Sequence, residues 1–521
     1  MVAPHCFYHA LPPGLDSAWP MKSLIVPGYD VWGPIGEGGM SEVWLAKHEG
    51  LAVPVVIKTL RAALVESEGA LAAARVRSEA RLMARVSSPR IVRALDAGQV
   101  ASTGIPYLVQ EYVDGLDLAE LDRRRRASLG VGLPLWLVCH VMREVGLGLR
   151  AAHQAGVIHR DLKPSNVFAA AETGIRLGDF GIAVAVSDGA ARDTAGTLKF
   201  MAPEQFRGEE VGRYTDVWGA AATACDLRYG HAPFESVADI LHGSTPPRMP
   251  PPTTPAEAYF QQLLRAMLEK DVRNRPEDMS APLHHFAMLG RALEPPQPTA
   301  SRLDATTLLV GPVKLSFKVG DIATCEADAI VSSANFEMKM RSGVGDALRR
   351  RGGDEIEEEA MHAGEQALGT CLRTKPGRLP VKHIFHSVSA WNEVSCVGRA
   401  FARALLLADE HGCHSLAVPA LGTGAARVSL EMCANAMTTT LRWHAMLGGM
   451  RTRAITVWLD SETKRRAYQD VAEETFGLGE LGLLRAVDLG LAVDPNSSAP
   501  SPEGATFLDP RHSTDSSSQG S

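Results

Sequence analysis

Short apolar runs in the first half of the chain predict strands and helices around polar or glycine-rich segments. The β-branched run 55–57 predicts a strand that leads directly into Lys58. The segment 71–86 is rich in Ala, Arg and Glu and ends at Ser87-Ser88-Pro89, so it predicts a helix that stops before the proline. This pattern predicts a domain of mixed α+β type.

The second half repeats a different order, in which an apolar strand is followed by a glycine-rich or polar loop. Strands are predicted at 313–319, 329–331 and 415–419, and the segment Ile384-Phe385-His386-Ser387-Val388 comes between the last two. A glycine turn at 343–345 opens a predicted helix. Strands that alternate with helices, with glycine loops at their carboxyl ends, predict a layered α/β fold.

A proline-containing stretch, Glu-Pro-Pro-Gln-Pro-Thr-Ala-Ser, separates the two patterns and cannot continue a helix. With 521 residues, of which 45% are hydrophobic and 22% charged, the chain can bury two cores. We predict a flexible extension at 1–28, a first domain at 29–293, a linker at 294–309, a second domain at 310–478, a candidate short element at 479–493 and a disordered Ser-rich tail at 494–521.

Charge and cysteine content exclude several classes of protein. The formal net charge of −7 argues against a general nucleic-acid-binding surface. The run of four arginines at 123–126 is the exception, and we interpret it as a solvated helix end or loop, with a docking role as the alternative. The eight cysteines form no CxxC pair, which predicts reduced thiols and a cytoplasmic protein without a zinc site. We also expect no membrane anchor, because no apolar run approaches the roughly 20 residues of a spanning helix.

The segment His159-Arg160-Asp161-Leu162-Lys163-Pro164-Ser165-Asn166, followed by Asp179-Phe180-Gly181, has the residues that phosphoryl transfer needs, in the right order. Asp161 is the candidate base for an attacking hydroxyl, and Lys163 is placed to steady the γ-phosphate. Asn166 and Asp179 are the candidate ligands of Mg²⁺, with Mn²⁺ as the alternative ion.

An upstream glycine-rich segment supplies the other half of a nucleotide site. Its glycines let backbone amides close over a triphosphate, and Val43 is placed to cover the adenine. Lys58 is expected to reach the α- and β-phosphates, with Glu79 as the carboxylate that holds it. The predicted nucleotide-binding residues of this half are Ile35, Gly36, Gly38, Gly39, Val43 and Lys58.

These motifs, together with Met201-Ala202-Pro203-Glu204, Arg275 and Asp216, resemble the eukaryote-like Ser/Thr protein kinases of bacteria over residues 29–293. The resemblance implies a two-lobed fold, ATP as cofactor, protein substrates and a pairing of Glu204 with Arg275. It implies that Asp216 supports the catalytic loop, and it leaves a homodimer through the kinase domain open. One departure is Ser41, which replaces the third glycine of the phosphate-covering loop.

The segment between Asp179 and Glu204 offers the hydroxyls of Ser187, Thr194 and Thr197 for regulation. In kinases, an arginine such as Arg160 commonly binds a phosphorylated residue of this segment. We predict Thr194 as an autophosphorylation site.

The second domain, at 310–478, resembles the macrodomain, an ADP-ribose-binding module of three-layer α/β fold. By this resemblance, Asp321 accepts a hydrogen bond from the adenine amine and Asn335 contacts the distal ribose. One phosphate is cradled by Gly343, Val344 and Gly345, and the other by the loop that contains Gly422, Thr423 and Gly424.

The glycine turn also bears on whether this domain binds or hydrolyses ADP-ribose. Hydrolytic macrodomains have an aspartate directly after the Gly-Val step, whereas this chain has Gly345 there and Asp346 one position later. A shift of one residue rotates a helical side chain by about 100°. Ser332 also replaces the first residue of the usual Asn-Ala-Ala-Asn. We therefore favour binding, with a bifunctional kinase and ADP-ribosyl hydrolase, or a pseudokinase scaffold, as alternatives.

Overall fold

The computed structural model describes residues 24–37, 41–61, 80, 83, 85–170, 174–180, 198–242, 244–295, 298–391 and 394–478. Several predictions concern residues outside these ranges: those for Gly38, Gly39, Glu79, Ser187, Thr194, Thr197 and the segments 479–493 and 494–521.

The first lobe is a five-stranded antiparallel sheet in the order β1-β2-β3-β5-β4. Its strands are β1 (Tyr29–Glu37), β2 (Ser41–His48), β3 (Pro54–Leu60), β4 (Ala94–Gln99) and β5 (Pro106–Glu111). Along β3, Val55 and Ile57 are fully buried in the sheet's hydrophobic cluster. Because successive side chains point to opposite faces of a strand, Val56 and Lys58 project from the other face.

The second lobe is mainly helical. Its elements are α3 (Leu118–Leu129), α4 (Leu135–Gln154), α7 (Pro203–Arg207), α8 (Arg213–Tyr229), α9 (Val237–Leu241), α10 (Pro255–Met267) and α11 (Ser280–Leu293), with the small sheet β6 (Gly115–Asp117), β7 (Val167–Ala170) and β8 (Gly174–Leu177). Helix α4 is central: Val138, Val141, Met142, Val145 and Leu149 recur at helical spacing and are buried. The expected two-lobed fold is confirmed.

The second domain is built on an eight-stranded mixed sheet in the order β13-β14-β12-β17-β18-β11-β10-β9. Its strands are β9 (Ala300–Asp304), β10 (Thr307–Val310), β11 (Val313–Val319), β12 (Ala329–Ser333), β13 (Cys371–Thr374), β14 (His383–Ser387), β17 (Ser415–Pro419) and β18 (Ala454–Leu459); β15 (Ala390–Trp391) and β16 (Val394–Ser395) form a separate pair. Strands β14, β12, β17, β18 and β11 run parallel, so their carboxyl ends meet at one edge. The strands predicted from the apolar runs are present.

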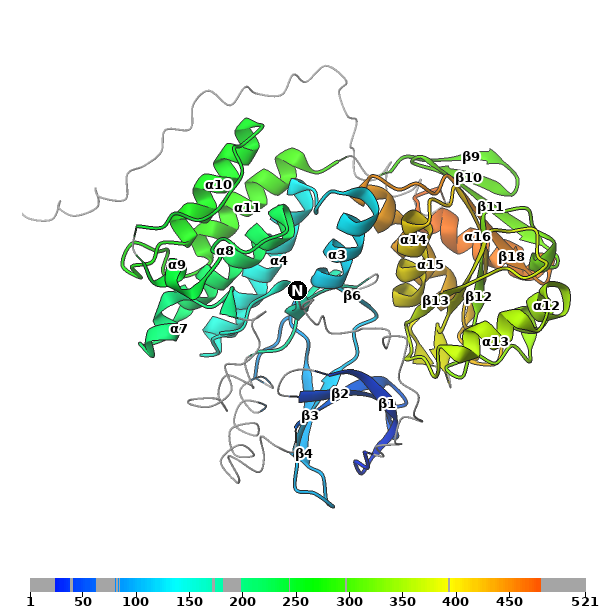
Figure 1. Cartoon of the computed structure of the whole chain (residues 1–521), viewed down its shortest axis with the longest axis horizontal. Helices are drawn as coiled ribbons and strands as arrows, with labels where there is room; N and C mark the ends of the chain where they lie inside the picture. The colour runs from blue at the N-terminus through cyan, green and yellow to red at the C-terminus, as the bar shows by residue number, and fades with distance from the viewer. Residues whose placement is uncertain are drawn as a thin grey trace, which may run out of the picture.

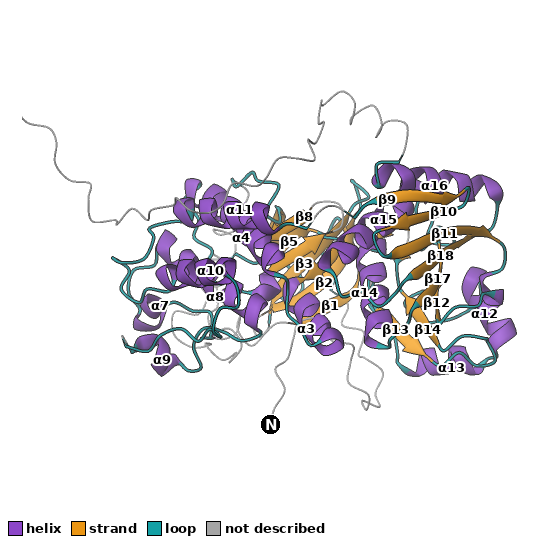
Figure 2. Ribbon diagram, turned by 90° about the horizontal axis from the view of Figure 1, so that it is seen from above, coloured by secondary structure: helices purple, strands orange, loops and turns teal. Residues whose placement is uncertain are grey.

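Helices cover both faces of this sheet, which makes the three layers that we expected (Figure 2). One face carries α14 (Val397–Glu410), α15 (Leu430–Leu447) and α16 (Glu462–Thr475) over one hydrophobic core. The other carries α12 (Gly343–Gly352) and α13 (Glu355–His362) over a smaller core.

Two predicted boundaries are wrong. The linker assigned to 294–309 contains β9 and most of β10, because Leu308 and Val310 are fully buried in the second domain's core. The extension assigned to 1–28 is ordered at its end, since Val26 is buried in the first lobe's cluster and pairs with Tyr29.

The two domains meet where α3 packs against α14 (Figure 1). Two residues of the run 123–126, Arg124 and Arg125, face the second domain, so the interpretation of the run as a solvated helix end is wrong for this pair. The other two do not face it: Arg123 is exposed, and Arg126 bonds within the first domain. Arg124 binds Glu120 and Glu410, and Arg125 donates to the carbonyl oxygen of Gly448 at 2.8 Å. The alternative, docking, is what these contacts support.

No helix in the described part of the chain is both long and apolar enough to cross a membrane.

Candidate functional site

The candidate catalytic loop lies between α4 and β7. The ammonium of Lys163 is 2.8 Å from Asp161 Oδ2. Asn166 Nδ2 donates to the backbone oxygen of Asp161 at 2.7 Å and to Oδ2 at 3.2 Å. The structure therefore brings together the predicted base and two of its predicted partners.

Asp216, in α8, holds this loop from behind. It is buried, and its carboxylate accepts hydrogen bonds from the backbone N–H groups of His159 at 2.9 Å and Arg160 at 2.8 Å. Arg160 has a φ of 67°, a strained conformation that persists only where the surroundings impose it. The predicted supporting role of Asp216 is confirmed.

Asp179 faces the loop from the end of β8 and also has a positive φ, of 53°. The next residue, Phe180, is buried against the ring of His159, with centroids 4.5 Å apart. Asp179 forms an ion pair with Lys58 from β3. We expected Glu79 as the partner of Lys58, and Glu79 lies outside the described residues.

Burial lowers the pKa of Lys58 to about 7, and the positive charge of Lys163 acts in the same direction. The two lysines therefore converge on one small region. Each lysine is paired with a carboxylate here, Lys58 with Asp179 and Lys163 with Asp161, so the positive and negative charges of this region balance.

A cavity between the lobes contains most of the predicted nucleotide-binding side chains. It is lined by Ile35, Val43, Val56, Lys58, Asn166 and Asp179 from the first domain. Gly36 lies in β1 with its backbone paired to Val43. The carboxylate of Asp179 and the amide of Asn166 offer oxygen donors of the kind that Mg²⁺ prefers, so this pair fits the ion. Arg399, from the second domain, also lines this cavity.

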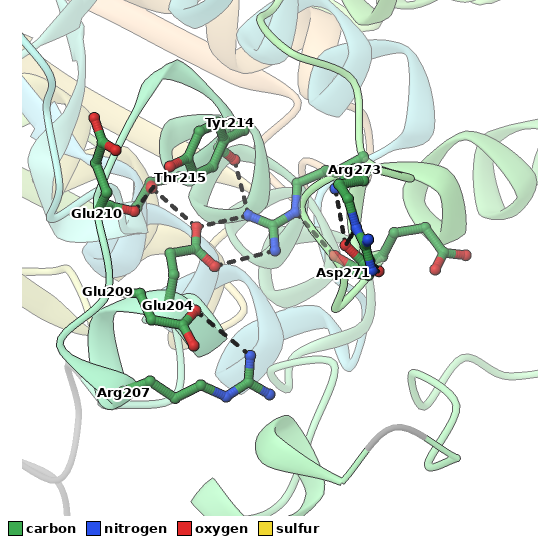
Figure 3. A network of polar contacts seen from close by, with 10 residues as sticks. Glu204, Arg207, Glu209, Glu210, Tyr214, Thr215, Asp271 and Arg273 are labelled. Atoms are coloured by element: carbon green, nitrogen blue, oxygen red, sulfur yellow. Dashed lines mark hydrogen bonds and ion pairs between the residues drawn. The ribbon is translucent and has the colours of Figure 1, made fainter.

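A buried ion pair fixes the segment that follows. Arg275 contacts both carboxylate oxygens of Glu204, at 2.7 and 3.2 Å. Thr215 donates to Glu204 at 2.9 Å (Figure 3). The side chains of Arg275 and Glu204 are 0% and 1% exposed. The predicted pairing of Glu204 with Arg275 is confirmed.

In the second domain, the predicted ligand residues follow the parallel strands. Asp321 comes after β11, Asn335 after β12, and Gly422 after β17, so all three lie at the same edge of the sheet. Ligands of open α/β sheets bind at this edge.

Local bonds hold these residues. Asp321 accepts a hydrogen bond from Ala323 N at 2.9 Å and contacts Arg351 Nε at 3.0 Å. Asn335 Oδ1 accepts from Lys339 N at 2.9 Å. Asp321 is exposed and Asn335 is half-buried, so both side chains can be reached by a ligand.

The two glycine loops differ in exposure. Gly343, at the start of α12, has a φ of 56° and is exposed, Val344 is half-buried, and Gly345 is buried against Met340. In the other loop, Gly422 has a φ of 75° and its N–H donates to Ser333 Oγ at 3.2 Å.

Thr423 Oγ1 donates to Ala420 O at 2.9 Å, and Gly424 is exposed. The Thr423 hydrogen bond therefore closes the loop on itself, whereas the side with Gly424 is open to solvent. Asp346 contacts Arg349 and Arg350 of its own helix, and these bonds lower its pKa.

The sequence did not identify four residues that act at or near these sites: Ser333, Asp114, Arg399 and Arg403. Ser333 joins the ends of β12 and β17, whereas the other three join the two domains. No motif surrounds them, so only the spatial arrangement identifies them.

Comparison with protein families gives two matches. The protein kinase domain family matches residues 29–287, and the macro domain family matches residues 331–437. The chain is 30% identical over 339 residues to a protein named Serine/threonine-protein kinases drp72 from Corynebacterium efficiens, with 62% of this chain and 63% of the relative covered.

It is also 30% identical over 314 residues to PknA of Corynebacterium glutamicum, with 58% of this chain and 65% of the relative covered. The chain is 34% identical over 213 residues to PknB of Mycobacterium tuberculosis, with 40% of this chain and 33% of the relative covered. The chain therefore spans less than two thirds of the length of these relatives. A crystal structure of the PknI kinase domain of M. tuberculosis matches 53% of this chain and 99% of that chain, with 26% identity and a TM-score of 0.42. The two family matches and the curated relatives identify the chain as one that contains a bacterial serine/threonine protein kinase domain, similar to that of PknB, followed by a macro domain.

Proposed function

We propose that this protein transfers the γ-phosphate of ATP to serine or threonine residues of proteins. The observation that carries the proposal is the placement of Asp161 beside Lys163 and Asn166, next to a cavity that Asn166 lines together with Lys58 and Asp179. Asp161 accepts the proton of the attacking hydroxyl, and Lys163 stabilises charge on the transferred group.

Lys58 binds the α- and β-phosphates in this proposal. Asn166 and Asp179 hold Mg²⁺, which neutralises developing charge on the phosphates. The ion pair between Lys58 and Asp179 opens when nucleotide and metal bind, since each group then has a partner of opposite charge.

The test is phosphate incorporation from labelled ATP by the wild-type chain and by Asp161→Asn. Loss of the base lowers the rate by about 10²- to 10⁴-fold, while ATP affinity changes little because Asp161 does not line the cavity described above. Equal incorporation by both proteins, or none by either, contradicts the proposal. The second result favours the pseudokinase scaffold.

We also propose autophosphorylation, at Thr194, on the grounds given by the sequence. Mass spectrometry of the chain after incubation with ATP locates the phosphate. A Thr194→Ala variant with unchanged activity and unchanged phosphate content contradicts the assignment.

For the macro domain we propose binding of ADP-ribose or a related nucleotide. The shared position of Asp321, Asn335 and Gly422 at the carboxyl edge supports this, because backbone N–H groups at such an edge bind phosphates without a cationic side chain. The engagement of Asp346 by Arg349 and Arg350 favours binding over hydrolysis.

Calorimetric titration of ADP-ribose into the full chain tests this proposal. Asp321→Ala removes the acceptor for the adenine amine and weakens binding about tenfold, in line with one lost hydrogen bond to a charged group. Asp304→Ala, an exposed aspartate on β9, serves as the matched control. No saturable binding contradicts the proposal, and release of free ADP-ribose from an ester substrate that depends on Asn335 favours the hydrolase.

A last proposal is that ADP-ribose alters kinase output or directs the kinase to ADP-ribosylated substrates. The direct contact between the domains supports it. Equal kinase rates and substrate choice with and without ADP-ribose contradict it.

A further inference from the structure

Arg399 lies on helix α14 of the macro domain but lines the nucleotide cavity of the kinase domain. Its side chain is buried, with 4% exposure. On the kinase side its cavity neighbours include Tyr112 and Val113, which follow β5 and connect the two lobes. A cation from the second domain is therefore part of the wall of the first domain's site.

The kinase domain itself fixes the start of α14. Within the described chain, Cys396 at the N-cap position makes no capping hydrogen bond with its side chain. Asp114 of the kinase domain takes this role: its carboxylate accepts from Gly398 N at 3.0 Å and from Arg399 N at 2.9 Å. A carboxylate at a helix N-terminus satisfies free N–H groups and complements the helix dipole.

One turn further along α14, Arg403 makes two hydrogen bonds to Glu120 of α3, at 2.9 and 2.7 Å. Residues four positions apart lie on the same face of a helix, so Arg399 and Arg403 both face the kinase domain. The stem of Arg399 also packs on Gly369, where an added Cβ would lie 2.7 Å from Arg399 Cδ. The position of Arg399 is thus set from several directions.

The charge of Arg399 acts on the segment that connects the two lobes. It lowers the pKa of Tyr112 and of Asp117 against the larger, opposing effect of burial. The groups expected to meet the phosphates, Lys58 and Asp179, pair with each other. A guanidinium beside Tyr112 and Val113 therefore faces the nucleoside end of a bound nucleotide, where ribose hydroxyls match its planar set of N–H donors.

The macro domain also contacts the strands that cover the nucleotide. Ile35, Val43 and Leu45 of β1 and β2 belong to one hydrophobic cluster with Met338 and Val388 of the macro domain. The second domain therefore bridges both lobes, and the lobes cannot change their spacing without changing this interface.

We propose that the macro domain completes the ATP site of the kinase, with Arg399 as a nucleotide-binding residue that contacts the nucleoside end of ATP. This inference rests on the proposed kinase function, because it assumes that the cavity binds ATP. Nucleotide binding and docking of the two domains are then linked, since each stabilises the other.

The test is the dissociation constant of Mg²⁺-ATP, and separately of ADP, measured by calorimetry on the full chain. Arg399→Met removes the charge but keeps an apolar stem. It weakens the binding of ATP and of ADP by the same factor, about tenfold for a lost charged hydrogen bond. Arg399→Lys keeps the charge but lacks the planar set of donors, so its ATP affinity lies between those of wild type and the Met variant. The matched control is Arg451→Ala, which removes one exposed contact between the domains, to Ser128 O. The buried contacts of Asp114 and Arg403 keep the domains docked in this variant, so ATP affinity stays at the wild-type value.

Unchanged or tighter ATP binding by folded Arg399→Met overturns the inference, and tighter binding identifies Arg399 as a blocking group. Retained ADP-ribose affinity shows that the variant is folded. If the Met variant does not fold, the Lys variant decides: weaker ATP binding supports the inference, and unchanged binding overturns it. Failure of the wild-type chain to bind ATP overturns the proposed kinase function itself, and so is distinct from failure of the inference alone.

Discussion

The buried ion pair between Glu120 of the kinase domain and Arg403 of the macro domain should be a main determinant of how the domains are held together. Both side chains are 4% exposed. Arg403 binds both carboxylate oxygens of Glu120 and also donates to Gly369 O at 2.8 Å. The perturbation is Glu120→Gln, which keeps the shape and removes the charge.

The size of the effect follows from the pKa of Glu120. Burial alone raises this pKa, but the attraction and hydrogen bonds of Arg403, with Arg124 and Arg399 adding, outweigh it and lower the pKa from 4.5 to about 2. Each pKa unit corresponds to about 1.4 kcal/mol, so the charged form stabilises the fold by about 3 kcal/mol at neutral pH. Because the pKa in the folded state is the lower one, this stabilisation is present above about pH 4.5 and is lost as the pH falls toward 2.

The assay is urea-induced unfolding followed by tryptophan fluorescence, at pH 7 and at several lower pH values. Glu120→Gln lowers the free energy of unfolding by about 3 kcal/mol at pH 7, and the difference from wild type shrinks below pH 4.5. The control is Glu410→Gln, because Glu410 meets Arg124 at 3.4 Å with both side chains partly exposed, and it costs less than about 1 kcal/mol. Equal midpoints for Glu120→Gln and wild type at pH 7 refute the reasoning.

Three further predictions concern other sites. Arg275→Leu leaves the carboxylate of Glu204 buried without its cation and lowers the free energy of unfolding by about 3 to 5 kcal/mol, which thermal unfolding measures; a change below 1 kcal/mol would contradict it. Burial raises the pKa of Asp117 from 3.8 to about 7, so ionisation of this carboxyl lowers the free energy of unfolding as the pH rises through that interval. Asp117→Asn therefore has a higher free energy of unfolding than wild type at pH 8, by up to about 4 kcal/mol, and this difference vanishes near pH 4. Gly422→Ala places a Cβ at a φ of 75° and 2.8 Å from a neighbouring side chain, so ADP-ribose affinity falls about tenfold while ATP affinity is unchanged; equal loss for both ligands would point to general unfolding.

The sequence was informative where a function depends on short spacing along the chain. The catalytic loop places Asp161, Lys163 and Asn166 within six positions, and their hydrogen bonds are local. The same holds for the apolar runs that became β12 and β17, because burial on both faces of a sheet requires continuous apolar residues. The two domain types and their order were therefore readable from residue types alone.

Boundaries and charged surfaces were predicted less well. The proline-rich composition near 294–309 indicated a linker, but it did not show that Leu308 and Val310 belong to the core of the second domain's sheet. The arginines at 123–126 resemble a solvated helix end, and only the carboxylate of Glu410 and the carbonyl of Gly448 show that two of them, Arg124 and Arg125, face another domain.

The sequence by itself determined the chemistry of each site, because the reacting groups lie in short motifs whose order is typical of each family. Only the tertiary structure decided that Arg399 enters the kinase cavity and that Asp114 caps a helix of the macro domain. These residues are 285 positions apart, and no local propensity links them. Their contact follows from the packing of two complete domains, which requires the shape and the charge of both surfaces at once.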